Sequence, residues 1–419
     1  MDNTAASPQV ITAADGTPLK KKLAQAMFRS RVRAFGLVVP LFSFVLVSFV
    51  IPILALMWQG VYNDTFAKLT PNLTQQLAEW DGVSEPTEPM FEALVLDIRT
   101  ARKDKTIGRI ATRVNQELPG TRSLFTSSAR KVKRVKPPYA VSMVKINKKW
   151  GQLDVWQAMK LTSQSLTPGF YATALDGKYT VDQGFVSQVE NRQIYVKLFW
   201  RTLLISGSVM LLCLLLGYPV AYLLATLPLR QSNLLMIMVL LPFWTSLLVR
   251  TTAWIALLQS QGVINDLLVW VGIAANDSRF SLIYNMTGTI IAMTHILLPF
   301  MILPLYSVMK TIPPSYMRAA RSLGATPSWA FIRIYMPQTV PGIGAGGLLV
   351  FILAIGYYIT PALVGGQDGQ LISNMIAYHM QKSLNWSLAA ALGGILLSGV
   401  LLLYWAYDRI IGIDNMKLG

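Results

Sequence analysis

Charge-free stretches alternate with polar stretches along this chain, and six of the charge-free stretches are long enough for a membrane-spanning helix. Such a helix needs about 20 apolar residues to cross a hydrocarbon core of about 30 Å. Inside a bilayer every backbone amide must be hydrogen-bonded within the protein, and the stretches lack the alternation of a membrane β-barrel, so helices are predicted. The predicted spans are 35–58, 202–227, 231–249, 286–308, 341–363 and 387–407.

Composition agrees with this pattern. Hydrophobic residues make up 53% of the chain and charged residues 14%, whereas a soluble protein carries about 25% charged residues. The single cysteine, Cys213, excludes an intrachain disulfide, and the two histidines, His295 and His379, leave little basis for metal or histidine-relay chemistry. We therefore predict an all-α polytopic membrane protein without a metal site or a catalytic centre.

The positions of the basic residues predict the orientation. If the N-terminus is cytoplasmic, thirteen Lys and Arg lie in cytoplasmic segments and three lie in the opposite short loops, as the positive-inside rule requires. The first apolar stretch is too long for a secretory signal, so it is predicted to remain as an anchor helix. The predicted parts are cytoplasmic tails at 1–33 and 410–419, a first span at 34–58 and a five-helix core at 199–409.

Residues 59–198 then form a large extracytoplasmic insertion between the first two spans. The insertion has the size of a small domain. Its 20 Lys and Arg against 13 Asp and Glu supply much of the net charge of +17, which argues against nucleic acid as a partner. Met90–Lys103 and Asp154–Leu161 have helical patterns. Five cations in 130–136 either contact anionic lipid headgroups or form a solvated loop face. The sequence assigns no function to the insertion.

The cytoplasmic loop at 311–338, hereafter the hairpin, carries residues that start and stop helices. Pro314 can open a short helix that Gly324 closes, because proline suits the first helical turn and glycine accepts the left-handed conformation at a helix end. Thr326 and Pro327 can restart a helix in the same way. The pattern leaves open whether the hairpin packs on its own bundle or offers a surface to another protein.

The hairpin resembles the EAA motif of permease subunits in ABC importers. That motif reads Glu-Ala-Ala, three residues, Gly, nine residues, Ile, one residue, a hydrophobic residue, then Pro. Arg318 stands in the usual glutamate position, which points to complementary acidic residues on the partner or to a contact made without that side chain. The positions with matching spacing are Ala319, Ala320, Gly324, Ile334 and Pro337.

The resemblance covers about 199–409 and favours the spermidine/putrescine permease branch. It implies one half of a translocation pathway in the bacterial inner membrane for a small organic cation, with the hairpin as the element coupled to ATP hydrolysis. It also implies a cytoplasmic ABC ATPase dimer, a second homologous permease subunit and an extracytoplasmic substrate-binding protein as partners. No phosphate-binding loop is present, since Gly177-Lys178 is followed by Tyr179. The chain itself is therefore expected to bind no cofactor, and ATP would be used by the partner.

The path through the membrane must replace water around a cation. No Asp or Glu lies in a predicted span, but aromatic rings can hold ammonium groups by cation–π contacts. Interfacial anchoring or helix packing would explain the same residues. Residues 242–251 also resemble the spermidine/putrescine permease branch and add two polar candidates, Thr245 and Arg250. The full set of candidates is Trp244, Thr245, Arg250, Trp254, Tyr357 and Tyr358.

Two further features of the predicted spans have a structural explanation. Gly342 and Gly346 form a Gly-x-x-x-Gly pair, which lets the fifth span pack closely on a neighbouring helix. His295 in the fourth span is interpreted as a packing residue rather than a proton relay.

Other functions share parts of this layout. An anchor helix followed by an external domain and a second helix is typical of a membrane receptor with a sensor domain, but here four further helices would have no use. A membrane-embedded enzyme would need a nucleophile with a base, paired carboxylates or a histidine-rich motif. Within transport, the cargo could instead be another small solute, such as an opine or an amino-acid derivative.

Overall fold

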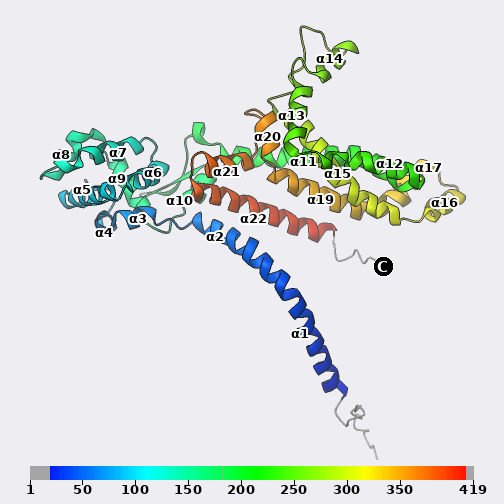
Figure 1. The fold of residues 1–419 in the computed structure, drawn as a ribbon, viewed down its shortest axis with the longest axis horizontal. Helices are drawn as coiled ribbons and strands as arrows, with labels where there is room; N and C mark the ends of the chain where they lie inside the picture. Colours follow the sequence, from blue (N-terminus) through cyan, green and yellow to red (C-terminus); the bar gives the residue numbers. More distant parts are fainter. Residues whose placement is uncertain (1–18, 182, 412–419) are drawn as a thin grey trace, which may run out of the picture. The chain divides into compact units, whose positions relative to one another are not determined.

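The computed structural model describes residues 19–181 and 183–411 and is predominantly helical (Figure 1). The chain divides after Trp58 into two units. The first unit contains α1 (Leu19–Val45), a π-helical turn (Leu46–Val50) and α2 (Ile51–Gln59) except for its last residue. Its apolar stretch Ser30–Gln59 is long enough to cross a membrane. The helix begins at Leu19, inside the predicted tail 1–33, whose first 18 residues lie outside the described residues.

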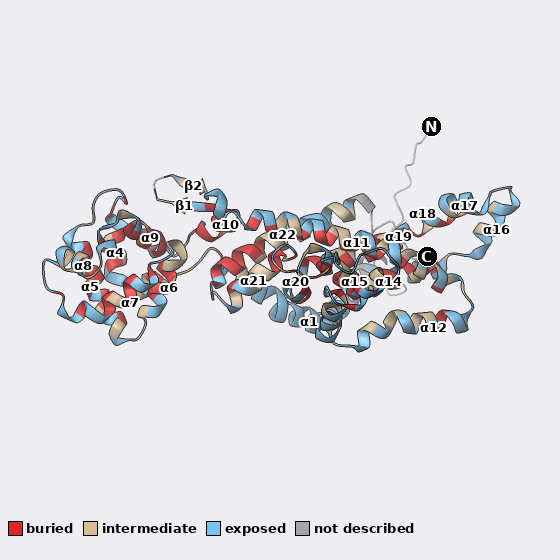
Figure 2. Ribbon diagram, turned by 90° about the horizontal axis from the view of Figure 1, so that it is seen from above, coloured by how far each residue is buried: buried red, intermediate tan, exposed pale blue. Residues whose placement is uncertain are grey.

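The insertion folds around its own hydrophobic core in the second unit (Figure 2). The predicted helices at Met90–Lys103 and Asp154–Leu161 are confirmed as α5 and α9, whose apolar faces are buried. Phe91 and Trp156 meet edge to face at 4.7 Å between ring centres, an arrangement that aromatic pairs prefer. The helices are α3 (Thr65–Leu69), α4 (Pro71–Glu79), α5 (Glu88–Lys103), α6 (Ile107–Glu117), α7 (Arg122–Lys131), α8 (Tyr139–Ile146), α9 (Leu153–Ser163) and α10 (Gly169–Ala174).

The all-α prediction is wrong in one detail, because the insertion ends in a β-hairpin. Strands β1 (Gly177–Thr180) and β2 (Gly184–Ser187) pair antiparallel, with Thr180 opposite Gly184. Gly184 has a φ of +66°, a conformation that glycine adopts without steric cost. A strand of four residues is too short for its alternation to stand out in the sequence.

The membrane part of the second unit is built from long apolar helices. Among the described residues, four helices in the chain are long and apolar enough to span a membrane, or up to six if each of two bent helix pairs is one span. The long helices α11, α15 and α19 pack together around a buried apolar core (Figure 1). The helices are α11 (Tyr195–Thr226), α12 (Leu229–Leu240), α13 (Leu247–Leu258), α14 (Val263–Trp270), α15 (Met286–Thr311), α16 (Pro314–Ser322), α17 (Pro327–Ala330), α18 (Met336–Gln338), α19 (Val340–Gly356), α20 (Ile359–Val364), α21 (Ile372–Gln381) and α22 (Trp386–Ile411).

The predicted single helix at 231–249 is wrong. Helix α12 continues into a 3₁₀ turn at Leu241–Trp244, the backbone becomes extended at Thr245, and α13 starts in a new direction, with a bend of 98°. Pro242 supplies no amide hydrogen and so weakens the helix. Ser246 caps the new helix, since its hydroxyl accepts a hydrogen bond from Val249 N at 3.2 Å. The predicted loop after this span therefore contains two helices, α13 and α14.

The predicted helix at 341–363 is also interrupted. Helix α19 ends at Gly356, the backbone is extended at Tyr357, and the short helix α20 follows. The carbonyl oxygens exposed by the break have side-chain donors, because Ser373 Oγ donates to Tyr357 O at 2.6 Å and Asn374 Nδ2 donates to Tyr358 O at 2.8 Å. The Tyr358 carbonyl also accepts from Ala362 N at 3.0 Å, so it is the bond from Ser373 that pairs a carbonyl group which the break would otherwise leave unpaired in an apolar environment.

Glycines let α15 and α19 approach closely. A Cβ atom on Gly346 would lie 2.9 Å from Met301 Sδ and 3.1 Å from the Met301 carbonyl oxygen. A Cβ atom on Gly342 would lie 3.1 Å from Val308 Cβ. All three distances are shorter than ordinary contacts, so the close packing predicted for the Gly-x-x-x-Gly pair is confirmed.

Candidate functional site

The hairpin starts and stops its helices at the predicted residues. Helix α16 begins at Pro314 and ends at Ser322, and Gly324 follows with a φ of +89°. The Ala325 amide reaches back to the Ala320 carbonyl at 3.1 Å, the kind of bond that closes a helix before a left-handed glycine. The Thr326 hydroxyl accepts from Trp329 N at 3.4 Å and opens α17.

Aromatic side chains attach the second half of the hairpin to α11. Helix α17 continues through a π-helical segment, Phe331–Tyr335, into α18. Phe331 lies edge to face with Tyr222 of α11 at 5.4 Å, and Tyr335 lies edge to face with the same ring at 5.3 Å. The Tyr218 hydroxyl is 3.1 Å from Thr339 Oγ1. The second half of the hairpin is therefore packed on α11.

The first half of the hairpin packs on its own bundle only through the partly buried side chains of Ile312 and Met317. Helix α16 has no buried residue, and Leu323 is 90% exposed at its end. Together with α17 it frames an apolar groove of about 530 Å³. Exposed apolar surface of this kind is typical of a protein-binding face. The groove residues are Ala320, Leu323, Gly324, Ala325, Thr326, Trp329 and Ile334.

The structure divides the five residues with matching spacing in the hairpin, and Arg318 beside them, into two groups. Ala320, Gly324 and Ile334 line the groove, whereas Arg318, Ala319 and Pro337 are exposed and do not line it. Within the described part of the chain, Arg318 has no ion-pair partner. The groove also includes Leu323 and Trp329. Their apolar side chains in a polar loop indicate a binding face, but the spacing of the motif does not include these two positions.

Some of the predicted path residues converge at the breaks in the membrane helices. Trp254 of α13 donates from Nε1 to His295 Nδ1 of α15 at 3.1 Å. Arg250 lies one turn earlier on α13 and is within electrostatic reach of both His295 and Tyr357. Arg250 Nε is buried and has no hydrogen-bond partner among the described residues. A polar cluster at the meeting point of three helices is where a solute path is expected in a membrane protein.

The other path residues lie apart from this cluster. Trp244 is 74% exposed at the break between α12 and α13, with Thr245 beside it. Tyr358 is 39% exposed. The structure adds Thr251 and Thr360, whose hydroxyl oxygens are 3.3 Å apart and join α13 to α20. Their pairing could not be predicted, because it depends on the break after Trp244.

Comparison with known proteins agrees with these features. Residues 202–411 match the family described as the binding-protein-dependent transport system inner membrane component. The chain belongs to this family. It is a permease component of an ABC importer and a multi-pass protein of the bacterial inner membrane. The insertion lies outside the matched residues.

Individual relatives of this permease each match somewhat more than half of the chain. The spermidine/putrescine transport system permease protein PotB of Escherichia coli K12 is 36% identical over an alignment of 241 residues that covers 55% of this chain and 87% of that protein. PotB of Haemophilus influenzae is 35% identical over 225 residues, 54% and 78% of the two chains. A crystal structure of a bacterial ABC transporter that imports the acidic polysaccharide alginate aligns with 59% of this chain and 88% of that chain, at 20% identity and a TM-score of 0.44. That likeness is too weak to bear on mechanism.

Proposed function

We propose that this permease forms half of the translocation pathway of an ATP-driven importer. In this proposal it has six spans, both termini are cytoplasmic, and the insertion is extracytoplasmic. ATP is bound and hydrolysed by a cytoplasmic ABC ATPase dimer, and this chain holds no cofactor of its own. A second homologous permease subunit supplies the other half of the pathway. The exposed groove on a hairpin that is anchored to α11 is the observation that carries the proposal.

The hairpin is proposed as the coupling element between the ATPase and the membrane helices. Its groove offers apolar side chains to a partner, while Phe331 and Tyr335 hold its other half on α11. The hairpin is also continuous with the ends of α15 and α19. A rigid-body push on the groove would therefore be passed to three packed helices, because tightly packed elements move together rather than deform.

Reversing the charge of Arg318 tests the electrostatic part of this contact. Arg318→Glu is expected to weaken association with the ATPase severalfold, because an acidic partner surface would then be repelled. The measurement is a titration of the chain in detergent with the ATPase that co-purifies with it, at low and at moderate salt. Arg321→Glu, an equal change at an exposed residue of the same helix, is the control. If the two variants weaken binding equally, a specific role for Arg318 is excluded.

The cargo is proposed to be a small organic cation, such as putrescine or spermidine, handed over by an extracytoplasmic binding protein. The names of the PotB relatives support this class of cargo. In the converging cluster, Trp254 and Tyr357 offer aromatic rings, whereas the charge of Arg250 opposes a cation. This combination suits brief passage rather than tight binding, so the selectivity is assigned to the binding protein.

Uptake by vesicles that contain the complete importer tests the cargo. Labelled putrescine or spermidine is expected to accumulate when ATP is supplied on the ATPase side, and the other polyamine should compete. An importer with an inactive ATPase is the control for leakage. If neither polyamine competes for or drives uptake while another solute does, the polyamine assignment is wrong and the transporter class remains.

A further inference from the structure

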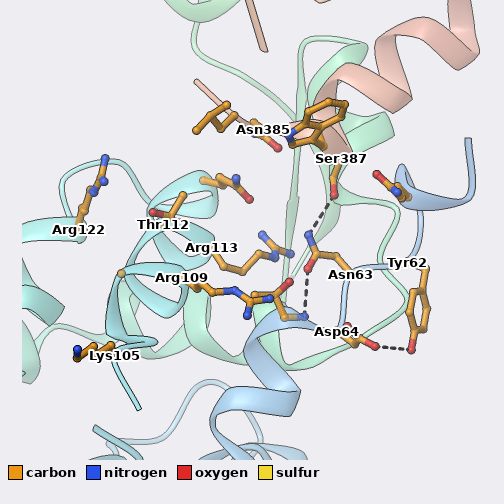
Figure 3. Close-up of a pocket in the computed structure, with 16 residues that line it drawn as sticks. Tyr62, Asn63, Asp64, Lys105, Arg109, Thr112, Arg113, Arg122, Asn385 and Ser387 are labelled. Atoms are coloured by element: carbon orange, nitrogen blue, oxygen red, sulfur yellow. Dashed lines mark hydrogen bonds between the residues drawn. The ribbon is translucent and has the colours of Figure 1, made fainter. Parts of the chain in front are cut away.

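The insertion forms one wall of a cavity whose other wall belongs to the membrane part of the same unit (Figure 3). The cavity has a volume of about 770 Å³, within the usual range for small-molecule sites of about 300–1,000 Å³. Asn63 Nδ2 donates to Ser387 Oγ at 3.0 Å and joins the two walls. Ser387 follows Trp386, the first residue of the candidate span α22. The cavity therefore lies at the end of a membrane helix.

Cations dominate the side chains around this cavity. Lys105, Arg109, Arg113 and Arg122 line it, and Asp64 is the one carboxylate among its described lining residues. That carboxylate is already engaged, because Lys68 Nζ pairs with it at 2.7 Å. Positive charges that line a concave, partly desolvated site attract an anion more strongly than the same charges do on an open surface. We refer to this cavity as the cation pocket.

Arg113 is buried in the wall of the cation pocket without a full set of partners. The residue is 2% exposed, and its Nη1 donates to Glu117 Oε1 at 2.9 Å. Its guanidinium group also lies over the Phe170 ring at 4.8 Å. Nε and Nη2 have no hydrogen-bond partner among the described residues, and Figure 3 shows the side chain directed from α6 toward Asn63. Unpaired buried donors on a charged group are costly and require an explanation.

We propose that the cation pocket binds the phosphate group of an anionic ligand, carried by a phospholipid headgroup or present as free phosphate. Arginine forks match phosphate oxygens with paired hydrogen bonds. After Asp64 and Glu117 are counted, the four cations leave an excess of two positive charges. The volume of the pocket is larger than a bare phosphate requires. Trp386, which lines the pocket, is half exposed at the start of a span, a position where tryptophan typically contacts lipid headgroups. The same charge excludes a polyamine from this pocket.

Lipid and phosphate binding to the purified full chain test this proposal. The delipidated chain in a neutral detergent is titrated with dioleoyl-phosphatidylglycerol, with dioleoyl-phosphatidylcholine and with inorganic phosphate, and binding is followed by native mass spectrometry and by the shift in melting temperature. Phosphatidylglycerol is expected to bind more tightly than phosphatidylcholine, with inorganic phosphate as a competitor. If inorganic phosphate binds and phosphatidylglycerol shows no preference, the pocket takes free phosphate.

Variants assign the binding to this pocket. The double variant Arg109→Gln and Arg122→Gln changes two exposed side chains and is expected to reduce affinity at least about tenfold, since hydrogen bonds to charged groups are the strong ones. Arg113 is left intact, because its loss would leave Glu117 unpaired and the chain could fail to fold. The matched control, Arg130→Gln with Arg134→Gln, removes the same charge from exposed residues of the basic run outside the pocket.

Two results would overturn the proposal. One is an unchanged affinity in the double variant for whichever phosphate compound binds the unmodified chain. The other is an equal loss in the control, which would mean that the overall charge of the insertion attracts anions without a built site. Because the assay needs neither the ATPase nor a cargo, its outcome is independent of the transport proposal.

Discussion

The variant Gly324→Val is expected to eliminate co-purification of the ATPase while the chain still reaches the membrane. The backbone at Gly324 is left-handed, with a φ of +89°, and an L-residue there costs about 1–2 kcal/mol. A β-branched side chain makes the strain worse, because its branched Cβ crowds the backbone. The turn would relax by changing the angle between α16 and α17, which frame the groove. A docking surface that depends on this angle loses its shape.

The space around Gly324 shows that backbone strain, and not a clash, is the cause. No atom lies within 4 Å of a Cβ built at Gly324, so valine would fit if the backbone tolerated it. Gly184 in the β-hairpin of the insertion also has a positive φ, +66°, and open space around its Cβ, so Gly184→Val is a matched control. The control is expected to keep the ATPase. Normal ATPase recovery with Gly324→Val would rule out our role for the hairpin.

Alanine substitutions at two adjacent glycines of α19 are expected to differ in their effect on stability, and this difference is the second large expected effect. Gly346→Ala is expected to lower the free energy of unfolding by about 1–3 kcal/mol, because its Cβ meets the backbone of Met301 and overpacks the contact with α15. Gly347→Ala is expected to be neutral or to stabilise by up to about 1 kcal/mol, because alanine favours a helix more than glycine does. Its Cβ would lie 3.6 Å from Met210 Sδ, an ordinary contact.

Thermal unfolding of the purified chain in detergent measures this contrast, with the fraction of folded chain in membranes as a second readout. Both variants add the same methyl group to neighbouring buried positions of one helix. Helix propensity therefore cannot separate them, and only the distance between α15 and α19 can. Equal melting temperatures for the two variants would show that the helices are not as close as the structure has them.

The two ends of α11 have different roles in these proposals. The insertion leads directly into the start of α11 at Tyr195, and Tyr222 near its other end contacts the hairpin. A helix of 32 residues spans about 48 Å at 1.5 Å per residue. The cation pocket is lined by residues of the insertion and of the start of α22, and the groove by residues of the hairpin, so ligand binding and ATPase docking are proposed as separate events. A variant in one region should leave binding at the other intact.

Local chemistry explains what could be predicted about this protein from its sequence. Charged groups are costly in lipid, so charge-free stretches mark most of the spans, and the hydrophobic face of Met90–Lys103 marks a helix of the insertion. The turns of the hairpin were predictable because Pro314, Gly324 and Thr326 act through their own dihedral angles and side chains. The family resemblance of the hairpin also depends on spacing alone.

Tertiary structure decided how the spans are broken and which distant residues meet. A hydropathy pattern cannot distinguish a straight span from a broken one, because Ser373 satisfies the Tyr357 carbonyl at the break from outside that stretch. Trp254 and His295 become partners only after α13 changes direction. The cation pocket likewise requires Asn63 and Ser387 to come together across more than three hundred residues, and no local pattern of charge or hydrophobicity encodes a contact of that range.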